Sequence, residues 1–380
     1  MKSLAAGGLK HLFFFLLAIA SLRLSALGAG EFEGWRAEWE KTLEAAKKEG
    51  QLTIYTDPEH EMMFDGFKKK YPEIKLLFVG SESVDLGPRL LTELRAKKYI
   101  ADLYKGGLTT QIRLLYKSGV LAPIKPVLIL PEVVDESKWY KGRHIYGDPE
   151  GKYVFVFEMS VRDSGVTYNT NLVNPNEIAS YWDLLNPKWK GKMVGLDPKA
   201  RGPVSNNLRY FYYNPSLGSD FVNRLFSETG ITLARDDRQM MNWLASGKFI
   251  FYLSPRGTDI AKAQGLPVDW LPRPRKEMPG IDLGQSTFSL LKTAPHPNAA
   301  KVALNWFFSR EGQIGFQNYS MGRPGLGGNS AREDIPKDMV NPIKRREKGM
   351  DYFFVSDPNH MDMDRIYKVV DDALAKVKRD

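Results

Sequence analysis

The sequence contains no cysteine. This absence excludes disulfide bonds, thiolate zinc sites, cysteine-ligated iron–sulfur clusters, cysteine nucleophiles and a lipid anchor on cysteine. The chain also has only five histidines among its 380 residues. It carries no complete nucleophile elbow, phosphate loop or dinucleotide-binding motif. We therefore expect a protein that is held together by its hydrophobic cores, is not an enzyme and needs no cofactor.

Metal-ligand patterns are incomplete. His60-Glu61 begins like the helix of a zinc protease, but position 64 is Phe, so the second histidine ligand is missing. Acidic residues gather between Asp357 and Asp364, yet the glycine that a calcium loop requires is absent. A solvated acidic helix start explains that cluster, and the sequence predicts no metal site.

Long apolar runs are also missing, apart from one near the start. Residues 12–20 are apolar, basic residues precede them, and small residues gather at 25–30. This order is typical of a secretory signal peptide, cleaved here between Gly28 and Gly30. A membrane anchor is the alternative, but the run is shorter than the about 20 residues of a spanning helix, and Arg23 interrupts it. We expect a soluble mature protein, exported to a bacterial periplasm.

Positive charge is in excess, with 54 Lys and Arg against 45 Asp and Glu and a formal net charge of +9. Such a balance suits nucleic acid, acidic lipid or anionic solutes. The densest basic run, residues 344–348, has no interleaved aromatic side chains of the kind that stack on bases. We interpret it as a solvated surface and expect no nucleic-acid partner, which leaves anionic solutes.

The chain alternates between predicted strands and helices, and its length favours two lobes. In the first part, helices are predicted at 35–48, 60–70, 86–98 and 108–118, and strands at 52–55, 74–79 and 101–104. Strands are also predicted at 153–157, 166–169, 193–196, 249–253 and 288–291. Later helices are predicted at 178–185, 220–226, 237–246, 260–264, 297–309 and 361–378, with a linker at 269–278. A further helix is predicted after Pro203, ending at about residue 212. Strand–helix–strand order at this spacing predicts parallel sheets with right-handed crossovers.

Small, polar or flexible residues follow the first three predicted strands. Ligands of parallel sheets bind outside the carboxyl ends of the strands, so these residues are a candidate binding edge. The same residue types are common in turns and helix caps, and both interpretations stand. The candidates are Thr56, Asp57, Ser81, Glu82, Ser83, Lys105 and Gly106.

Four stretches resemble a known family. They are residues 50–55 (GQLTIY), 101–104 (ADLY), 118–124 (SGVLAPI) and, most specifically, 182–192 (WDLLNPKWKGK). The chain resembles, over about residues 40–340, the ferric-type branch of the extracellular solute-binding proteins of bacterial ABC importers. The resemblance implies an α/β, two-lobed type II periplasmic binding protein fold. Each lobe would be a mixed, mostly parallel sheet flanked by helices, and two crossing strands near 159–168 and 270–283 would join the lobes.

The resemblance also implies a division of the chain and a function. Residues 1–30 would be the signal peptide, 31–161 and 276–327 the first lobe, and 162–275 and 328–380 the second. The lobes of a monomer would close around a small solute and deliver it to a membrane permease.

The ligand set of ferric members is incomplete in this chain. In the family an adjacent tyrosine pair usually holds the ion after the strand predicted at 249–253, but Ser254-Pro255-Arg256 stands there. Tyr252 and His60 remain as possible ligands, whereas Tyr212-Tyr213 lie at a helix end and are expected to pack. The positive charge of Arg256 would repel a trivalent cation, so ferric binding by the usual ligand set is disfavoured. Ferric ion or a ferric chelate is kept as the alternative ligand.

An anionic solute fits the residues better. Arg201 and Gly202 open a helix where relatives hold an anion on backbone N–H groups, and Arg162 matches a position near that anion. With Arg256, these guanidinium groups would grip a phosphonate, sugar phosphate or carboxylate through two-pronged hydrogen bonds. Surface or interlobe salt bridges are the other common fate of arginines.

Overall fold

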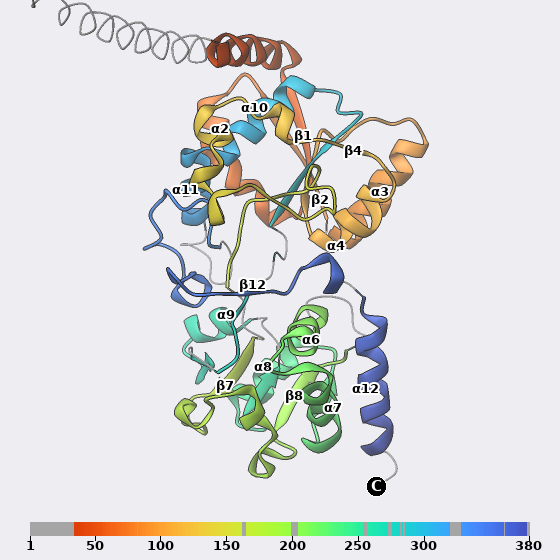
Figure 1. Ribbon diagram of the computed structural model, residues 1–380, viewed down its shortest axis with the longest axis vertical. Helices are drawn as coiled ribbons and strands as arrows, with labels where there is room; N and C mark the ends of the chain where they lie inside the picture. The colour runs from red at the N-terminus through yellow and green to blue at the C-terminus, as the bar shows by residue number, and fades with distance from the viewer. Residues whose placement is uncertain are drawn as a thin grey trace, which may run out of the picture.

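The computed structural model describes residues 34–81, 83–161, 165–198, 204–253, 257–272, 276–281, 283, 286–319, 328–360 and 362–377. The predicted signal peptide lies outside these residues. Two lobes lie one above the other along the long axis of the molecule, each with its own sheet and hydrophobic core (Figure 1). The predicted α/β, two-lobed architecture is confirmed.

The first lobe is built on a mixed seven-stranded sheet of order β2-β1-β3-β13-β6-β5, with β4 on β13. Its strands are β1 (Gln51–Thr56), β2 (Lys75–Gly80), β3 (Leu103–Gly106), β4 (Leu121–Ala122), β5 (Ile145–Tyr146), β6 (Phe155–Val156) and β13 (Thr287–Leu291). β1 runs parallel to β2 and β3, as predicted, and β13 is antiparallel to β3 and β6. β3 and β6 therefore point the same way, and their carboxyl ends lie at the same edge of the sheet.

Helices cover both faces of this sheet. They are residues 34–49, the 3-10 helix Pro58–Phe64, α2 (Asp65–Lys70), α3 (Ser83–Arg95), α4 (Leu108–Thr110), the π-helix Gln111–Tyr116, α5 (Pro131–Val134), α10 (Pro297–Phe308) and α11 (Arg310–Tyr319). Aromatic rings fill the core between sheet and helices: Phe64 stacks on Phe307 at 5.3 Å, and Phe155 stacks on Phe308 at 4.2 Å. α11 was not predicted, because only one residue separates it from α10.

The second lobe has a five-stranded sheet of order β11-β7-β10-β8-β9. Its strands are β7 (Val166–Asn169), β8 (Met193–Leu196), β9 (Thr232–Ala234), β10 (Phe251–Leu253) and β11 (Val268–Trp270), and its longer helices are α6 (Val204–Tyr213), α7 (Gly218–Glu228), α8 (Asp237–Ala245), α9 (Thr258–Ala263) and α12 (Asp364–Val377). The prediction of a linker from 269 is wrong at its start, because Val268–Trp270 pairs antiparallel with β7. The predicted helix 178–185 is the 3-10 helix Tyr181–Leu185, with Ser180 in a capping box.

Three segments pass between the lobes. Residues 157–166 and 271–287 are bridged by the pair Val161–Ile281. The third passage returns from the first lobe to the second through β14 (Phe353–Phe354), which lies parallel to β12 (Gly280–Ile281). It is the dark blue segment between the lobes in Figure 1, and it ends in α12 against α7.

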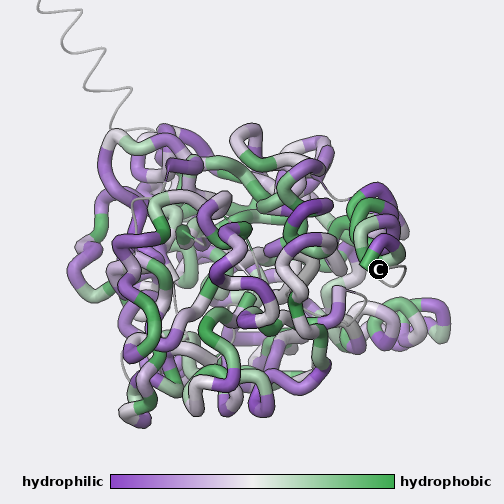
Figure 2. Tube along the Cα trace, turned by 90° about the horizontal axis from the view of Figure 1, so that it is seen from below, coloured by the Kyte–Doolittle hydropathy of each residue, from purple (hydrophilic) through white to green (hydrophobic). Residues whose placement is uncertain are grey.

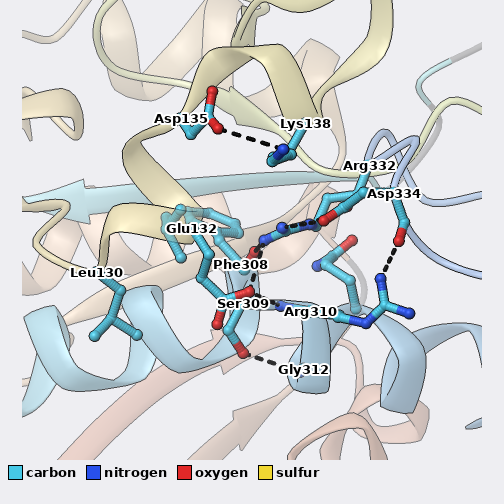
Figure 3. Close-up of polar contacts among 12 residues, drawn as sticks. Leu130, Glu132, Asp135, Lys138, Phe308, Ser309, Arg310, Gly312, Arg332 and Asp334 are labelled. Carbon is cyan, nitrogen blue, oxygen red and sulfur yellow. Dashed lines mark hydrogen bonds and ion pairs between the residues drawn. The ribbon is translucent and has the colours of Figure 1, made fainter.

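The third passage is anchored on the first lobe by buried cations. The Arg332 guanidinium is fully buried, donates two 2.8 Å hydrogen bonds to the Asp334 carboxylate and one of 3.0 Å to the carbonyl of Phe308, and lies 3.5 Å from a Glu132 oxygen (Figure 3). Two parallel bonds to a carboxylate are the strong geometry for an arginine. Arg332 therefore fixes the start of the passage.

Arg346 and Lys337 extend this anchor. Arg346 donates to the carbonyls of Met159, at 2.6 Å, and Ser330, at 3.0 Å, and its side chain is only 5% exposed. The prediction that residues 344–348 form a solvated surface is therefore wrong for Arg346, because carbonyl groups of the first and third passages bind it. Burial, with a further contribution from Arg346, lowers the pKa of Lys337 to about 7.

Hydrophobic residues are distributed along amphipathic helices. Figure 2 shows them interleaved with hydrophilic residues over the outer helices, and α12 buries Ile366, Val370 and Ala373. Within the described part of the chain, no helix combines the length and apolar character needed to cross a membrane.

We predict that Arg332→Met lowers the free energy of unfolding by about 3 kcal/mol, because the carbonyl of Phe308 and the partly buried carboxylate of Asp334 lose their hydrogen bonds to the guanidinium. Urea denaturation followed by tryptophan fluorescence measures the change. Arg235→Met is the matched control: Arg235 is 79% exposed in its pair with Asp197, so its loss should change stability by less than about 1 kcal/mol. Equal effects of the two substitutions would contradict the anchoring role of Arg332.

Candidate functional site

The edge of the first sheet that faces the second lobe gathers several of the predicted residues. β1 ends at Thr56 and β3 at Gly106, and the two strands are parallel neighbours, with Tyr55 opposite Tyr104. Their carboxyl ends therefore bring Asp57 beside Lys105. In Figure 1, α4, which follows β3, lies at the lower edge of the upper lobe, while α6 and α9 lie at the upper edge of the lower lobe.

His60 stands on the first turn after β1 and is buried. Its Nδ1 lies 3.3 Å from the Thr56 hydroxyl and 3.4 Å from an Asp57 carboxylate oxygen. Burial, with a smaller contribution from the charge of Lys105, lowers the pKa of His60 to about 2. The imidazole is therefore neutral at physiological pH and binds through hydrogen bonds rather than charge.

Lys105 is the most constrained charge at this edge. Its side chain is 1% exposed, and its ammonium lies 5.8 Å from the centre of the Phe157 ring. Burial lowers the pKa of Lys105 to about 7, against the opposing effect of Asp57, Glu158 and, more weakly, Glu59. Because a buried amine this close to losing its proton is stabilised by negative charge, Lys105 is suited to receive an anion.

Gln111 fixes the backbone next to Lys105. Its amide nitrogen donates to the carbonyl of Gly106 at 3.1 Å and to the Thr287 hydroxyl at 2.6 Å, and that hydroxyl donates to the same carbonyl at 2.7 Å. The Ser289 hydroxyl donates to the amide oxygen of Gln111. The four residues that form these bonds are all buried: Gly106, Gln111, Thr287 and Ser289. The hydrogen bonds therefore hold the end of β3 rigidly.

Glu158 is part of this edge and was not predicted. It follows β6, whose carboxyl end lies at the same edge as that of β3, and its charge acts on Lys105. Its two carboxylate oxygens accept hydrogen bonds from Ser160, at 2.6 Å, and from Ser286, at 2.7 Å. In the sequence, Glu158 comes directly after the strand predicted at 153–157. Polar residues at the carboxyl ends of the first three strands are predicted as site candidates, and the same criterion applied to this strand selects Glu158.

The tyrosines of the second lobe lie apart from this edge. Tyr252 is fully buried, and its hydroxyl donates to the carboxylate of Asp237 at the start of α8. Tyr213 donates to the carbonyl of Asp362 and stacks on His360 at 4.4 Å, and Tyr212 contacts Tyr213 edge-on. Tyr212-Tyr213 thus pack against the C-terminal segment, as predicted.

The structure brings Thr56, Asp57, His60, Lys105 and Gly106 together, with Ser81 adjacent through its N–H bond to the carbonyl of Thr56 and Ser83 at the start of α3. The other predicted site residues, Glu82, Arg162, Arg201, Gly202 and Arg256, lie outside the described residues. Among the residues that are described, no group of three His, Asp or Glu side chains is arranged to hold a metal ion.

We predict that Lys105→Met stabilises the protein most at low pH. Because the pKa of Lys105 is lower in the folded chain, the unfolded chain binds more protons between about pH 7 and 10.5, and wild-type stability gains with pH over this window. The advantage of the variant should therefore shrink, by on the order of 4 kcal/mol, as pH rises from 6.5 to 10. Urea denaturation at several pH values measures it. Exposed Lys152→Met is the control, and a difference independent of pH would contradict the assignment.

Comparison with known proteins gives a consistent family. A model of the family described as bacterial extracellular solute-binding protein matches residues 50–314. A protein of Haemophilus influenzae, itself uncharacterized, is 25% identical over 285 residues, which are 71% of this chain and 76% of the relative.

Solved structures share the fold. The periplasmic binding protein AfuA from Actinobacillus pleuropneumoniae, with fructose-6-phosphate bound, has a TM-score of 0.56 and 19% identity over 87% of this chain and 99% of AfuA. Iron-bound HitA from Pseudomonas aeruginosa has a TM-score of 0.59 and 16% identity, and the ferric binding protein from Campylobacter jejuni has 0.61 and 16%. Each of these two comparisons covers 85% of this chain and 99% of the other.

The family match over most of the chain, the two lobes and the polar edge between them lead to one conclusion. The protein belongs to the bacterial extracellular solute-binding proteins, the solute-binding components of ABC importers with the type II periplasmic binding protein fold.

Proposed function

We propose that this protein captures a small anionic organic or phosphorus-containing solute in the periplasm and delivers it to the membrane permease of its importer. A phosphonate, a sugar phosphate or a carboxylate is the proposed class. The observation that carries the proposal is Lys105, a buried amine at the edge of the first lobe whose pKa is lowered to about 7 by burial. An anion at this position restores the charge that burial disfavours.

The geometry supports capture by closure. A solute at the edge of the first sheet meets the second lobe only when the lobes approach, so its binding energy selects the closed state. Part of that energy offsets the ordering of the solute and the closure itself, and several good contacts are therefore needed. On the first lobe, Lys105 supplies charge, and neutral His60 and the Thr56 hydroxyl are suited to hydrogen bonds.

The second lobe is proposed to contribute the stronger anion contacts. Along the chain, Arg256 follows β10, Arg201 and Gly202 precede α6, and Arg162 comes directly after Val161. Guanidinium groups and the N–H groups at the start of α6 match the charge and geometry of an oxyanion. We further propose that residues 1–30 are a signal peptide cleaved near 28–30 and that the mature protein acts as a monomer.

Ferric ion or a ferric chelate is the second candidate, since two of the similar solved structures are described as iron-binding. The usual tyrosine pair is absent after β10, and the hydroxyl of Tyr252 is bonded to Asp237. A ferric site would have to draw Tyr252 away from α8.

We predict that one class of anionic solute raises the melting temperature, because a ligand that binds only the folded state stabilises it. A thermal-shift screen of phosphonates, sugar phosphates, dicarboxylates, polyamines, thiamine and ferric citrate makes the test. The Lys105→Met variant should lose the shift, and Lys152→Met should keep it. A shift with ferric citrate alone, with a visible band that disappears in Tyr252→Phe, would replace the anion proposal with the ferric one.

Arg256→Ala is expected to weaken binding of the solute found in that screen at least tenfold, about 1.4 kcal/mol, without lowering the melting temperature. The reason is the loss of the proposed two-pronged, charge-assisted contact between this guanidinium and the solute. Titration calorimetry measures the affinity, with exposed Arg235→Ala as the control. Unchanged affinity in Arg256→Ala would remove this arginine from the site.

A further inference from the structure

Backbone contacts between the three passages are concentrated around Glu158. The N–H of Phe157, in the first passage, donates to the carbonyl of Ser286 at the end of the second. The N–H of Met159 donates to the carbonyl of Asn329 at the start of the third. Glu158 stands between these two bonds and is itself bridged to Ser330. The backbone on either side of Glu158 is thus tied to both other passages.

The side chain of Glu158 also forms hydrogen bonds with residues of the passages. One carboxylate oxygen accepts from the hydroxyl of Ser160, and the other accepts from the hydroxyl of Ser286. The Ser160 hydroxyl accepts in turn from the N–H of Asn329, at 2.8 Å. Gly328 lies so close that a Cβ there would be 1.6 Å from a Glu158 oxygen. The carboxylate therefore holds Ser160 and Ser286 directly, and it reaches the third passage through the Ser160 hydroxyl.

The same carboxylate belongs to the electrostatic surroundings of Lys105. Among the described residues, the charged groups that act on Lys105 are Asp57 and Glu59 from the segment after β1 and Glu158 from the first passage, with neutral His60 beside them. Glu158 is thus shared between the proposed anion position and the passages.

We propose that Glu158 is a positioning residue that couples the charge at Lys105 to the arrangement of the passages and hence to lobe closure. The inference rests on the proposed function, since it takes Lys105 as the position of the solute anion. With the position empty, the ammonium attracts the Glu158 carboxylate. A bound anion competes for the same ammonium and weakens this attraction, so that only the hydroxyls of Ser160 and Ser286, which lie on two passages, then act on the carboxylate.

Loss of the Lys105 proton has the same consequence for Glu158 as a bound anion, because it also removes the attraction. A rise in pH should therefore move the lobes even without solute, which gives a test that needs no identified ligand. Lys337 is the other amine whose pKa burial lowers to about 7, and it lies in the anchor of the third passage, where it donates to the carbonyl of Ser330 at 2.9 Å. Because Lys337 would lose its proton over the same pH range, its contribution to any movement with pH must be tested alongside that of Lys105.

The chain has no cysteine, so two introduced cysteines carry spin labels uniquely. Tyr99 in the first lobe and Leu172 in the second are 50% and 51% exposed and are suitable positions. Double electron–electron resonance then measures the distance between the lobes at pH 6 and pH 9 without solute. We expect a shift of that distance with pH in the otherwise unchanged protein and in Glu59→Gln and Lys337→Met, and its loss in Glu158→Gln and in Lys105→Met.

Two results would overturn the coupling: no shift with pH in the parent protein, or a shift that survives in Glu158→Gln. A shift that vanishes in Lys337→Met while persisting in Glu158→Gln would assign the response to the anchor instead. Thermal melts confirm that each labelled variant is folded, and Glu158→Asp, which keeps the charge, should restore part of the shift if Glu158→Gln is unstable. Because no solute is used, failure to find a binding anion would contradict the proposed function without touching this result.

Discussion

A single buried amine sets the chemistry of this molecule. Lys105 is the penultimate residue of β3, whose carboxyl end faces the second lobe, and it is 1% exposed. Burial disfavours its charge, while Asp57 and Glu158 favour it, and the balance leaves its pKa near 7 rather than 10.5. Because the pKa of Lys105 lies near neutral pH, a charge placed beside the amine strongly changes its degree of protonation. The rigid support from Gln111 and Thr287 ensures that the response is electrostatic rather than a movement of the strand.

The lobes are independent in their cores but not in their connections. Each sheet has its own hydrophobic core, and three passages join them. Arg332, Lys337 and Arg346 hold the third passage on the first lobe through bonds to Phe308, Gln317 and Met159. At the far end of the passage, α12 packs on the second lobe. Relative movement of the lobes must therefore be absorbed by the short stretches between these anchors, which is the hinge arrangement expected for closure around a ligand.

The sequence was informative where local pattern determines structure. Apolar runs of four to six residues located most strands, and residues 193–196 coincide with β8. The order of strands and helices predicted the parallel unit β2-β1-β3, and the rule for strand ends selected Asp57 and Lys105.

Other features depend on contacts between remote segments. The two-residue strands β12 and β14 pair across more than 70 residues, and nothing in either dipeptide signals the partner. The burial of Arg332 and Arg346 likewise follows from carbonyl groups that the fold presents to them. The sequence alone therefore predicts a solvated surface for residues 344–348, which include Arg346. Glu158 was missed because its strand belongs to the first sheet only through β13, which enters from the far end of the chain.

The most direct test of this account is the number of protons taken up when the solute binds. Calorimetry at pH 8 in buffers of different ionisation enthalpy measures it. An anion beside Lys105 raises the pKa of that amine, so uptake of a large fraction of one proton is expected, and Lys105→Met should abolish it. Binding of the solute with no proton uptake, or with the same uptake in Lys105→Met, would contradict the central role of this lysine.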